Sequence, residues 1–92
     1  MMSDMIRRHI TFYGRVQRVG FRYTAEYTAS NNNCTGWVKN EYDGSVLMEI
    51  QGREEDIDEV LAALENDLYI RITEMEVEDL EPLEDEFGFK TL

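Results

Sequence analysis

The chain has 92 residues, enough for one domain with one hydrophobic core. Hydrophobic residues make up 42% of it, which is typical of a folded globular protein and excludes a disordered one. The formal net charge of −11 disfavours binding to nucleic acid in general. No apolar run approaches the length of a membrane span, so we expect no membrane insertion.

The charge is unevenly distributed along the chain. Residues 1–52 carry six Lys and Arg against five Asp and Glu, whereas residues 53–92 carry three against fifteen. Charges are screened beyond about 8 Å at physiological ionic strength. The local cluster of Arg15, Arg18 and Arg22 therefore acts independently of the distant acidic residues. Cys34 is the single cysteine, and no apolar signal segment precedes the first predicted strand. We therefore expect a cytoplasmic protein, and a monomer, as is usual for a small and highly charged domain.

The first predicted strand covers about residues 6–13, where polar and apolar residues alternate. A loop bounded by glycines follows at 14–20, and a helix is predicted over 21–32. The helix is predicted from four residues at the spacing of one helical face, Phe21, Ala25, Thr28 and Ala29. Asn33 then provides the left-handed residue that ends many helices.

A β-hairpin is predicted next. Its strands are residues 35–40 and 45–51, and the turn at 41–44 contains Asp-Gly, a strong turn signal. The second of these strands alternates two faces, one of which carries Val46, Met48 and Ile50. Gly52 is expected to close the strand.

The second half of the chain predicts a helix and a strand. The helix has an apolar stripe at helical spacing, Ile57, Val60, Leu61 and Leu64. A strand is predicted over about 69–80, with a bulge or register change between Ile72 and Met75, where alternation breaks. Pro82 ends this strand, and residues 87–90 are a candidate edge strand. The order βαββαβ predicts an α+β, ferredoxin-like two-layer sandwich, with an antiparallel sheet and two helices on one face.

The junction of strand, loop and helix at residues 14–22 is the main candidate site. Its sequence is GRVQRVGFR. Unpaired backbone N–H groups and the positive end of the helix dipole converge at such a junction, which favours an anion. Arg22 on the first helical turn adds a fork of donors that suits phosphate.

Two motifs resemble those of the acylphosphatase family. The first is Gly14-x-Val16-Gln17-x-Val19-x-Phe21-Arg22, which is similar to that family's phosphate loop. The second is Gly36-Trp37-Val38-Lys39-Asn40-x-x-x-Gly44-x-Val46, followed by Gly52 after five residues. Two long and independent matches in the predicted order are a specific signal. The resemblance implies one acylphosphatase-like domain over residues 1–92.

The resemblance implies hydrolysis of the carboxyl–phosphate bond of small acyl phosphates, which gives carboxylate and inorganic phosphate. It assigns catalytic roles to Arg22, which holds the phosphoryl group, and to Asn40, which positions the attacking water. The phosphate-binding loop that it implies comprises Arg15, Val16, Gln17, Arg18, Val19, Gly20 and Phe21. It implies no metal, no cofactor and no covalent enzyme intermediate.

One residue departs from the family's pattern. Arg18 stands in the middle of the phosphate loop, where the resembling family commonly has glycine. Glycine permits positive φ and a close approach of the backbone to phosphate. Arginine there either strains the loop, if positive φ is required, or adopts an ordinary conformation and adds charge. Hydrolysis is expected in either case, since Arg22 and Asn40 are both present.

Two alternatives stay open. One is a catalytically weak acylphosphatase-like phosphate-binding module, like the related domain at the start of larger carbamoyl-transfer maturation proteins. The other is an RNA-binding domain with the same element order, which requires exposed aromatic residues on the central strands and a basic face. His9 and Cys34 have no partners placed by a catalytic motif, and Trp37 is expected to serve packing. No Cys/His cluster indicates a metal.

Overall fold

The computed structural model describes residues 4–92. Its elements are β1 (Met5–Arg15), α1 (Phe21–Asn31), β2 (Thr35–Asn40), β3 (Val46–Arg53), α2 (Glu54–Glu65), β4 (Arg71–Leu80) and β5 (Phe89–Thr91). This order confirms the predicted βαββαβ pattern, and β5 confirms the short edge strand. Within residues 4–92, neither helix is long and apolar enough to cross a membrane.

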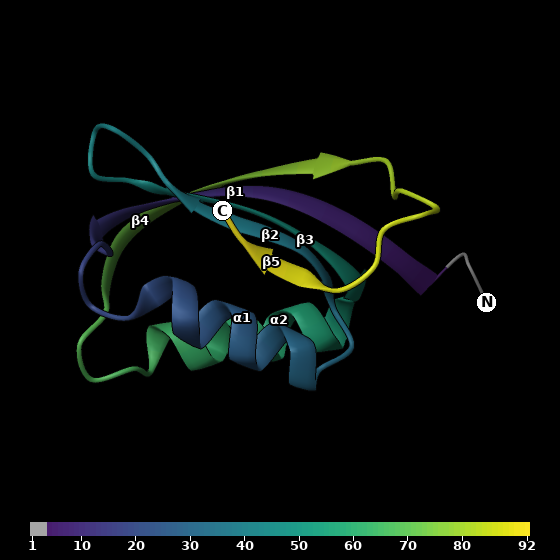
Figure 1. The fold of residues 1–92 in the computed structure, drawn as a ribbon, viewed down its shortest axis with the longest axis horizontal. Helices are drawn as coiled ribbons and strands as arrows, with labels where there is room; N and C mark the ends of the chain where they lie inside the picture. Colours follow the sequence, from purple (N-terminus) through teal and green to yellow (C-terminus); the bar gives the residue numbers. More distant parts are fainter. Residues whose placement is uncertain (1–3) are drawn as a thin grey trace.

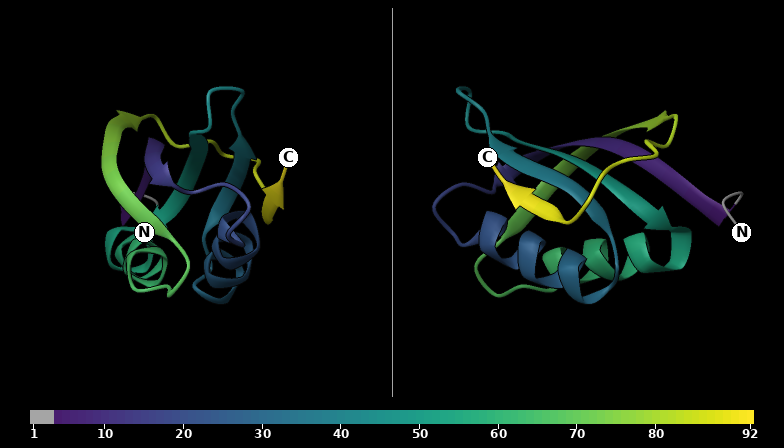
Figure 2. Two further views of the ribbon diagram at one scale, coloured as in Figure 1. Left: turned by 90° about the vertical axis from the view of Figure 1, so that its left-hand side faces the viewer. Right: turned by 45° about the vertical axis from the view of Figure 1, so that its right-hand side comes forward.

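The strands form one sheet in the order β4-β1-β3-β2-β5, and both helices cover the same face of it (Figures 1 and 2). The pairs β1–β3, β1–β4 and β2–β3 are antiparallel, as predicted. The edge strand β5 instead runs parallel to β2, so the sheet is mixed. The reason is the long connection at 81–88, which carries the chain from one edge of the sheet to the other before it pairs.

The core lies between the helices and the sheet. Its members are spaced by two in the strands and by three or four in the helices, as the predicted periodicities require. The largest fully buried side chains are Phe12, Phe21, Ile10, Met48, Ile50, Ile57, Leu64, Val16, Val38, Val46 and Val60. Phe21 and Phe12 meet edge to face with ring centroids 4.8 Å apart. This contact anchors the first residue of α1 on β1, immediately before Arg22.

The strand β1 extends two residues further than predicted, because a bulge in β4 allows the pairing of the two strands to continue through Gly14 and Arg15. Tyr13 pairs with Glu74 whereas Gly14 pairs with Ile72, so β4 has one extra residue at this point. This confirms the irregularity predicted between Ile72 and Met75. Gly14 has φ 124°, and a Cβ there would collide with the backbone oxygen of Arg71, so only glycine fits.

The end of α1 confirms the role predicted for Asn33. This residue has φ 58°, the left-handed conformation. The amide of Cys34 donates to the oxygen of Ala29 at 2.9 Å, and the amide of Asn33 donates to that of Ser30 at 3.4 Å. This pair of bonds is a Schellman motif, which satisfies the last carbonyls of the helix and turns the chain into β2.

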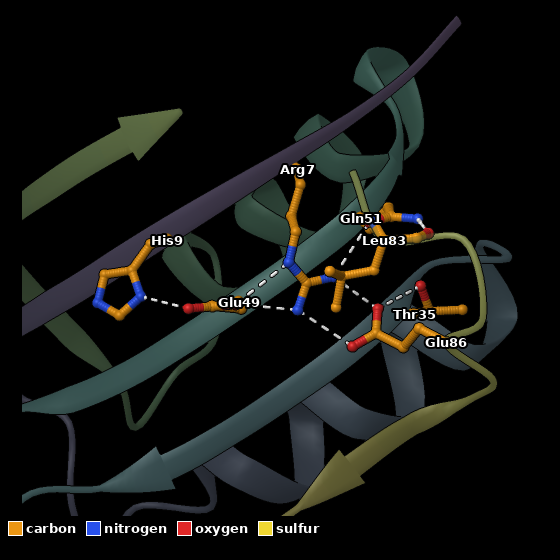
Figure 3. A network of polar contacts seen from close by, with 7 residues as sticks. All are labelled: Arg7, His9, Thr35, Glu49, Gln51, Leu83 and Glu86. Carbon is orange, nitrogen blue, oxygen red and sulfur yellow. Dashed lines mark hydrogen bonds and ion pairs between the residues drawn. The ribbon is translucent and has the colours of Figure 1, made fainter. Parts of the chain in front are cut away.

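A buried arginine holds the β4–β5 connection on the sheet face opposite the helices (Figure 3). Arg7 is only 2% exposed. Its guanidinium donates two hydrogen bonds to the carboxylate of Glu86, at 2.6 and 3.1 Å, and its Nη2 donates to Glu49 at 2.9 Å. Gln51 exchanges two hydrogen bonds of 2.8 Å with the backbone of Leu83. These contacts position the segment that leads into β5.

Candidate phosphate site

The loop between β1 and α1 has a buried anchor at each end. The side chains of Val16 and Phe21 belong to the core, so their contribution to a site is limited to the backbone. Between them, Arg18 and Gly20 have φ 64° and 82°, and these two left-handed residues turn the loop. Within residues 4–92, the amides of residues 16–20 donate no hydrogen bond to the protein, and no side chain caps α1. The loop therefore offers unpaired donors to an anion.

The structure settles the conformation of Arg18. Its φ of 64° lies in the left-handed region, so arginine adopts the conformation for which glycine is suited. A non-glycine residue there costs about 1–2 kcal/mol. The loop keeps this conformation, and the exposed side chain of Arg18 adds a positive charge beside the loop.

Gln17 connects the loop to the β2–β3 hairpin. Its side-chain amide donates to the backbone oxygen of Glu41 at 2.8 Å and to that of Ser45 at 2.9 Å. The Gln17 side chain is thus occupied by the hairpin, and it positions the loop beside the last residue of β2, Asn40. No periodicity in the sequence points to this contact, because it joins two loops.

The hairpin turn is itself held by a carboxylate. Asp43 accepts hydrogen bonds from the Oγ of Ser45 at 2.6 Å and from its amide at 2.9 Å. These bonds lower the pKa of the Asp43 carboxyl, and the bond from the Ser45 hydroxyl makes the largest contribution. Glu41 donates its amide to the oxygen of Ser45 at 2.8 Å, and Gly44 has φ 96°, as the predicted Asp-Gly turn requires. The turn therefore defines where Asn40 ends the strand.

Arg22 and Asn40 line one hollow of about 200 Å³, although they are 18 positions apart in the sequence. Arg22 is the second residue of α1, and Asn40 lies on the same strand face as the buried Val38. The hollow is lined by Val16, Arg18, Gly20, Phe21, Arg22, Tyr23 and Asn40. A cation, helix-terminal amides and a carboxamide thus face one small space, which suits a phosphate group and a water molecule.

The side chain of Arg22 is oriented by the far end of the chain. Its Nη1 donates to the backbone oxygen of Leu92 at 3.0 Å. Leu92 in turn donates its amide to the oxygen of Val38 at 2.9 Å, next to β5. The acceptor of this orienting contact is a backbone oxygen whose place depends on the parallel pairing of β5, so no sequence motif signals it.

Not every residue of the predicted loop lines the hollow. Gln17 contributes through the hairpin contacts described above, whereas Arg15 and Val19 border a separate hollow that they share with Arg18. Arg15 belongs to β1 rather than to the loop, because the bulge extends that strand.

The other candidate side chains lie elsewhere. His9 Nδ1 is 2.9 Å from Glu49 on the open face of the sheet, and its ring meets that of Trp37 edge to face. Burial raises the pKa of the Cys34 thiol to about 12, so a thiolate is not formed at neutral pH. Neither His9 nor Cys34 lines the hollow at Arg22 and Asn40.

Comparison with known proteins gives consistent matches. A family model described as Acylphosphatase matches residues 8–91. An acylphosphatase of Geobacillus kaustophilus is 38% identical over 89 residues, which cover 96% of this chain and 95% of that protein. The crystal structure of acylphosphatase from Bacillus subtilis has a TM-score of 0.86 at 32% identity, covering 95% of this chain and 98% of that chain. Full-length HypF, in a phosphate- and nucleotide-bound form, matches with a TM-score of 0.81 at 26% identity, over 96% of this chain and 12% of that one.

Proposed function

The chain belongs to the acylphosphatase family and is a hydrolase of acyl phosphates, and on this premise we propose that the hollow at Arg22 and Asn40 is its active site. Members of the family act on small acyl phosphates and release phosphate. The observation that carries the assignment is the meeting of Arg22, Asn40 and the unpaired loop amides around one hollow.

The phosphoryl group is bound by charge and by backbone donors. Arg22 forms charge-assisted hydrogen bonds to phosphate oxygens, each contributing about 1.5–3 kcal/mol. The amides at the start of α1 add the positive end of the helix dipole. Because the loop is anchored by Val16, Phe21 and Gln17, these donors are in place before the substrate binds. Such preorganised donors stabilise the transition state without reorganisation.

Asn40 positions the attacking water. A carboxamide does not take up protons near neutral pH, so Asn40 acts by orientation rather than as a general base. A carboxylate of low basicity leaves, which removes the need for a strong general acid. Phosphoryl transfer depends mainly on alignment and charge stabilisation, and both are available here. The proton of the water passes to an oxygen of the substrate's own phosphate.

The reaction proposed here needs no metal or cofactor, because Arg22 and the amides supply the positive charge that phosphoryl transfer requires. We further propose that the chain acts as one domain and as a monomer in the cytoplasm, a compartment that suits its single free thiol. We do not expect the chain to bind nucleic acid. The exposed glutamates of β4 (Glu74, Glu76 and Glu78) and the net charge of −11 oppose a polyanion.

The test is steady-state hydrolysis of benzoyl phosphate in excess EDTA. Arg22→Ala and Asn40→Ala are compared with matched controls, Arg53→Ala and Asn31→Ala, which change exposed residues outside the hollow. We expect kcat/KM to fall by at least about a hundredfold in the first pair, equivalent to about 2.7 kcal/mol, and to stay within about twofold in the controls. Activity that disappears with EDTA, or that survives in Arg22→Ala, contradicts the proposed mechanism. A folded wild type without activity favours the alternative of a phosphate-binding module.

A further inference from the structure

A second hollow adjoins the proposed active site. It measures about 450 Å³ and is lined by three arginines, Arg15, Arg18 and Arg71, together with residues of the α2–β4 connection. Arg18 lines both hollows, so the larger one lies next to the place where the phosphate is held. A substrate with its phosphate in the small hollow therefore has the large one within reach of its acyl group.

The three arginines lie without an acidic partner among residues 4–92. All three side chains are exposed, and within residues 4–92 none of them forms an ion pair. Arg15 and Arg71 are direct cross-strand partners in the β1–β4 pairing, an arrangement in which like charges repel. Among residues 4–92 no ion pair offsets this repulsion, and a cluster of cations is unusual in a chain of net charge −11. A ligand with negative charge would relieve the repulsion.

The remaining lining of this hollow is largely apolar. Ile70 is buried and Val19 packs against the core, while Leu68 and Tyr69 are 91% and 73% exposed at the rim. A hollow with apolar walls and a few convergent charged groups is the usual form of a site for a small organic anion. The guanidinium group binds carboxylate and phosphate through paired hydrogen bonds.

We propose that this arginine hollow, defined by Arg15, Arg18 and Arg71, binds the acyl group of the substrate and recognises an anionic substituent on it. The preferred substrates are then acyl phosphates whose acyl group carries its own carboxylate or phosphate. The inference rests on the proposed function, because it takes the phosphoryl group to be held at Arg22. It goes beyond that function by assigning a substrate selectivity to a hollow that includes Arg15 and Arg71, which lie outside the hollow at Arg22 and Asn40.

The test compares matched substrates. Para-carboxybenzoyl phosphate and para-phosphonobenzoyl phosphate carry the second anion, and para-carbamoylbenzoyl phosphate is the neutral counterpart of similar shape. Each kcat/KM is divided by the spontaneous hydrolysis rate of the same compound, which removes differences in leaving-group reactivity. An exposed ion pair changes an equilibrium by roughly two- to fivefold, so we expect the three cations together to favour an anionic substrate by about tenfold. The two anionic substrates separate recognition of carboxylate from recognition of phosphate.

Variants locate the effect. Arg71→Gln removes one cation without changing the phosphate loop, and Arg53→Gln removes an exposed cation at the start of α2 and thus matches the change in net charge. We expect Arg71→Gln to lower the preference to roughly fivefold, since one of three comparable cations is lost. Arg53→Gln is expected to leave it unchanged, and high salt is expected to reduce it in the wild type.

The outcomes separate this inference from the proposed function. Hydrolysis of all three substrates at equal corrected rates, or equal loss of the preference in Arg71→Gln and Arg53→Gln, overturns the arginine hollow and leaves the active site standing. If the folded protein hydrolyses none of them, the proposed function fails. The hollow is then tested by the affinities of para-carboxybenzylphosphonate and para-carbamoylbenzylphosphonate in calorimetry. Tighter binding of the carboxylate by several-fold supports it, and equal binding overturns it.

Discussion

Removing the Gln17 side-chain amide tests whether the contact between loop and hairpin matters for catalysis. Gln17→Met keeps the length of the side chain but removes the donor to the backbone oxygens of Glu41 and Ser45. Both acceptors keep another partner: Glu41 accepts from the amide of Gly44 at 3.2 Å, and Ser45 accepts from the amide of Glu41 at 2.8 Å. Two hydrogen bonds of about 0.5–1.5 kcal/mol each are therefore lost, and neither acceptor is left without a partner. We expect about 1–3 kcal/mol of destabilisation.

The effect on activity is expected to exceed the loss of stability. Gln17 holds the phosphate loop at a set distance from the hairpin that carries Asn40, and a displacement of about 1 Å between reacting groups costs up to a hundredfold in rate. We expect kcat/KM for benzoyl phosphate to fall by about ten- to a hundredfold. Urea denaturation gives the stability, and steady-state kinetics far below the unfolding transition give the activity.

A matched control separates positioning from simple destabilisation. Leu61→Ala removes a half-buried side chain of α2 that packs against the core and lies outside the hollow. It is expected to cost a comparable amount of stability, about 1–2 kcal/mol, and to leave kcat/KM unchanged. If Gln17→Met loses stability but keeps the wild-type kcat/KM, the contact serves the fold alone and the positioning argument is refuted.

Three further predictions follow from backbone geometry and from the buried arginine. Arg18→Gly removes the strain of the left-handed conformation but adds conformational freedom to the unfolded chain, so we expect stability to change by less than about 1 kcal/mol. We expect kcat/KM for benzoyl phosphate to change by less than about tenfold. Denaturation and steady-state kinetics measure the two quantities, and a larger change in activity would show that Arg18 shapes the active site. Gly14→Ala places a Cβ against the backbone oxygen of Arg71, and calorimetry should show a loss of about 3 kcal/mol or more; an unchanged melting temperature contradicts the bulge geometry. Burial opposes the charge on Glu86, but the hydrogen bonds from Arg7 and Thr35 outweigh it and hold the pKa of this carboxyl below its ordinary value. The ionised Glu86 therefore stabilises the fold fully above about pH 4.3, and this stabilisation is lost as pH falls through the lowered pKa. Glu86→Gln should therefore flatten the acid side of the stability profile measured by circular dichroism, and an identical profile would be inconsistent with this pairing.

The sequence by itself determined the order of the elements, and it predicted where an anion site forms. Apolar spacing and turn residues are local properties, and they predicted the order of strands and helices, the Asp-Gly turn and the left-handed Asn33. The start of α1 beside a glycine-bounded loop is also local, so Arg22 could be assigned to an anion site from its neighbours in the chain. The bulge in β4 was visible as a break in alternation.

Only the tertiary structure decided what residues far apart in the sequence do to one another. The parallel pairing of β5 depends on where the 81–88 connection crosses the sheet, and it brings the backbone oxygen of Leu92 to Arg22. The partners of Gln17 lie in another loop, and the facing of Arg15 and Arg71 depends on the register set by the bulge. The φ of Arg18 follows from anchors on both sides of its loop, since a local sequence permits more than one loop conformation and burial of Val16 and Phe21 selects one.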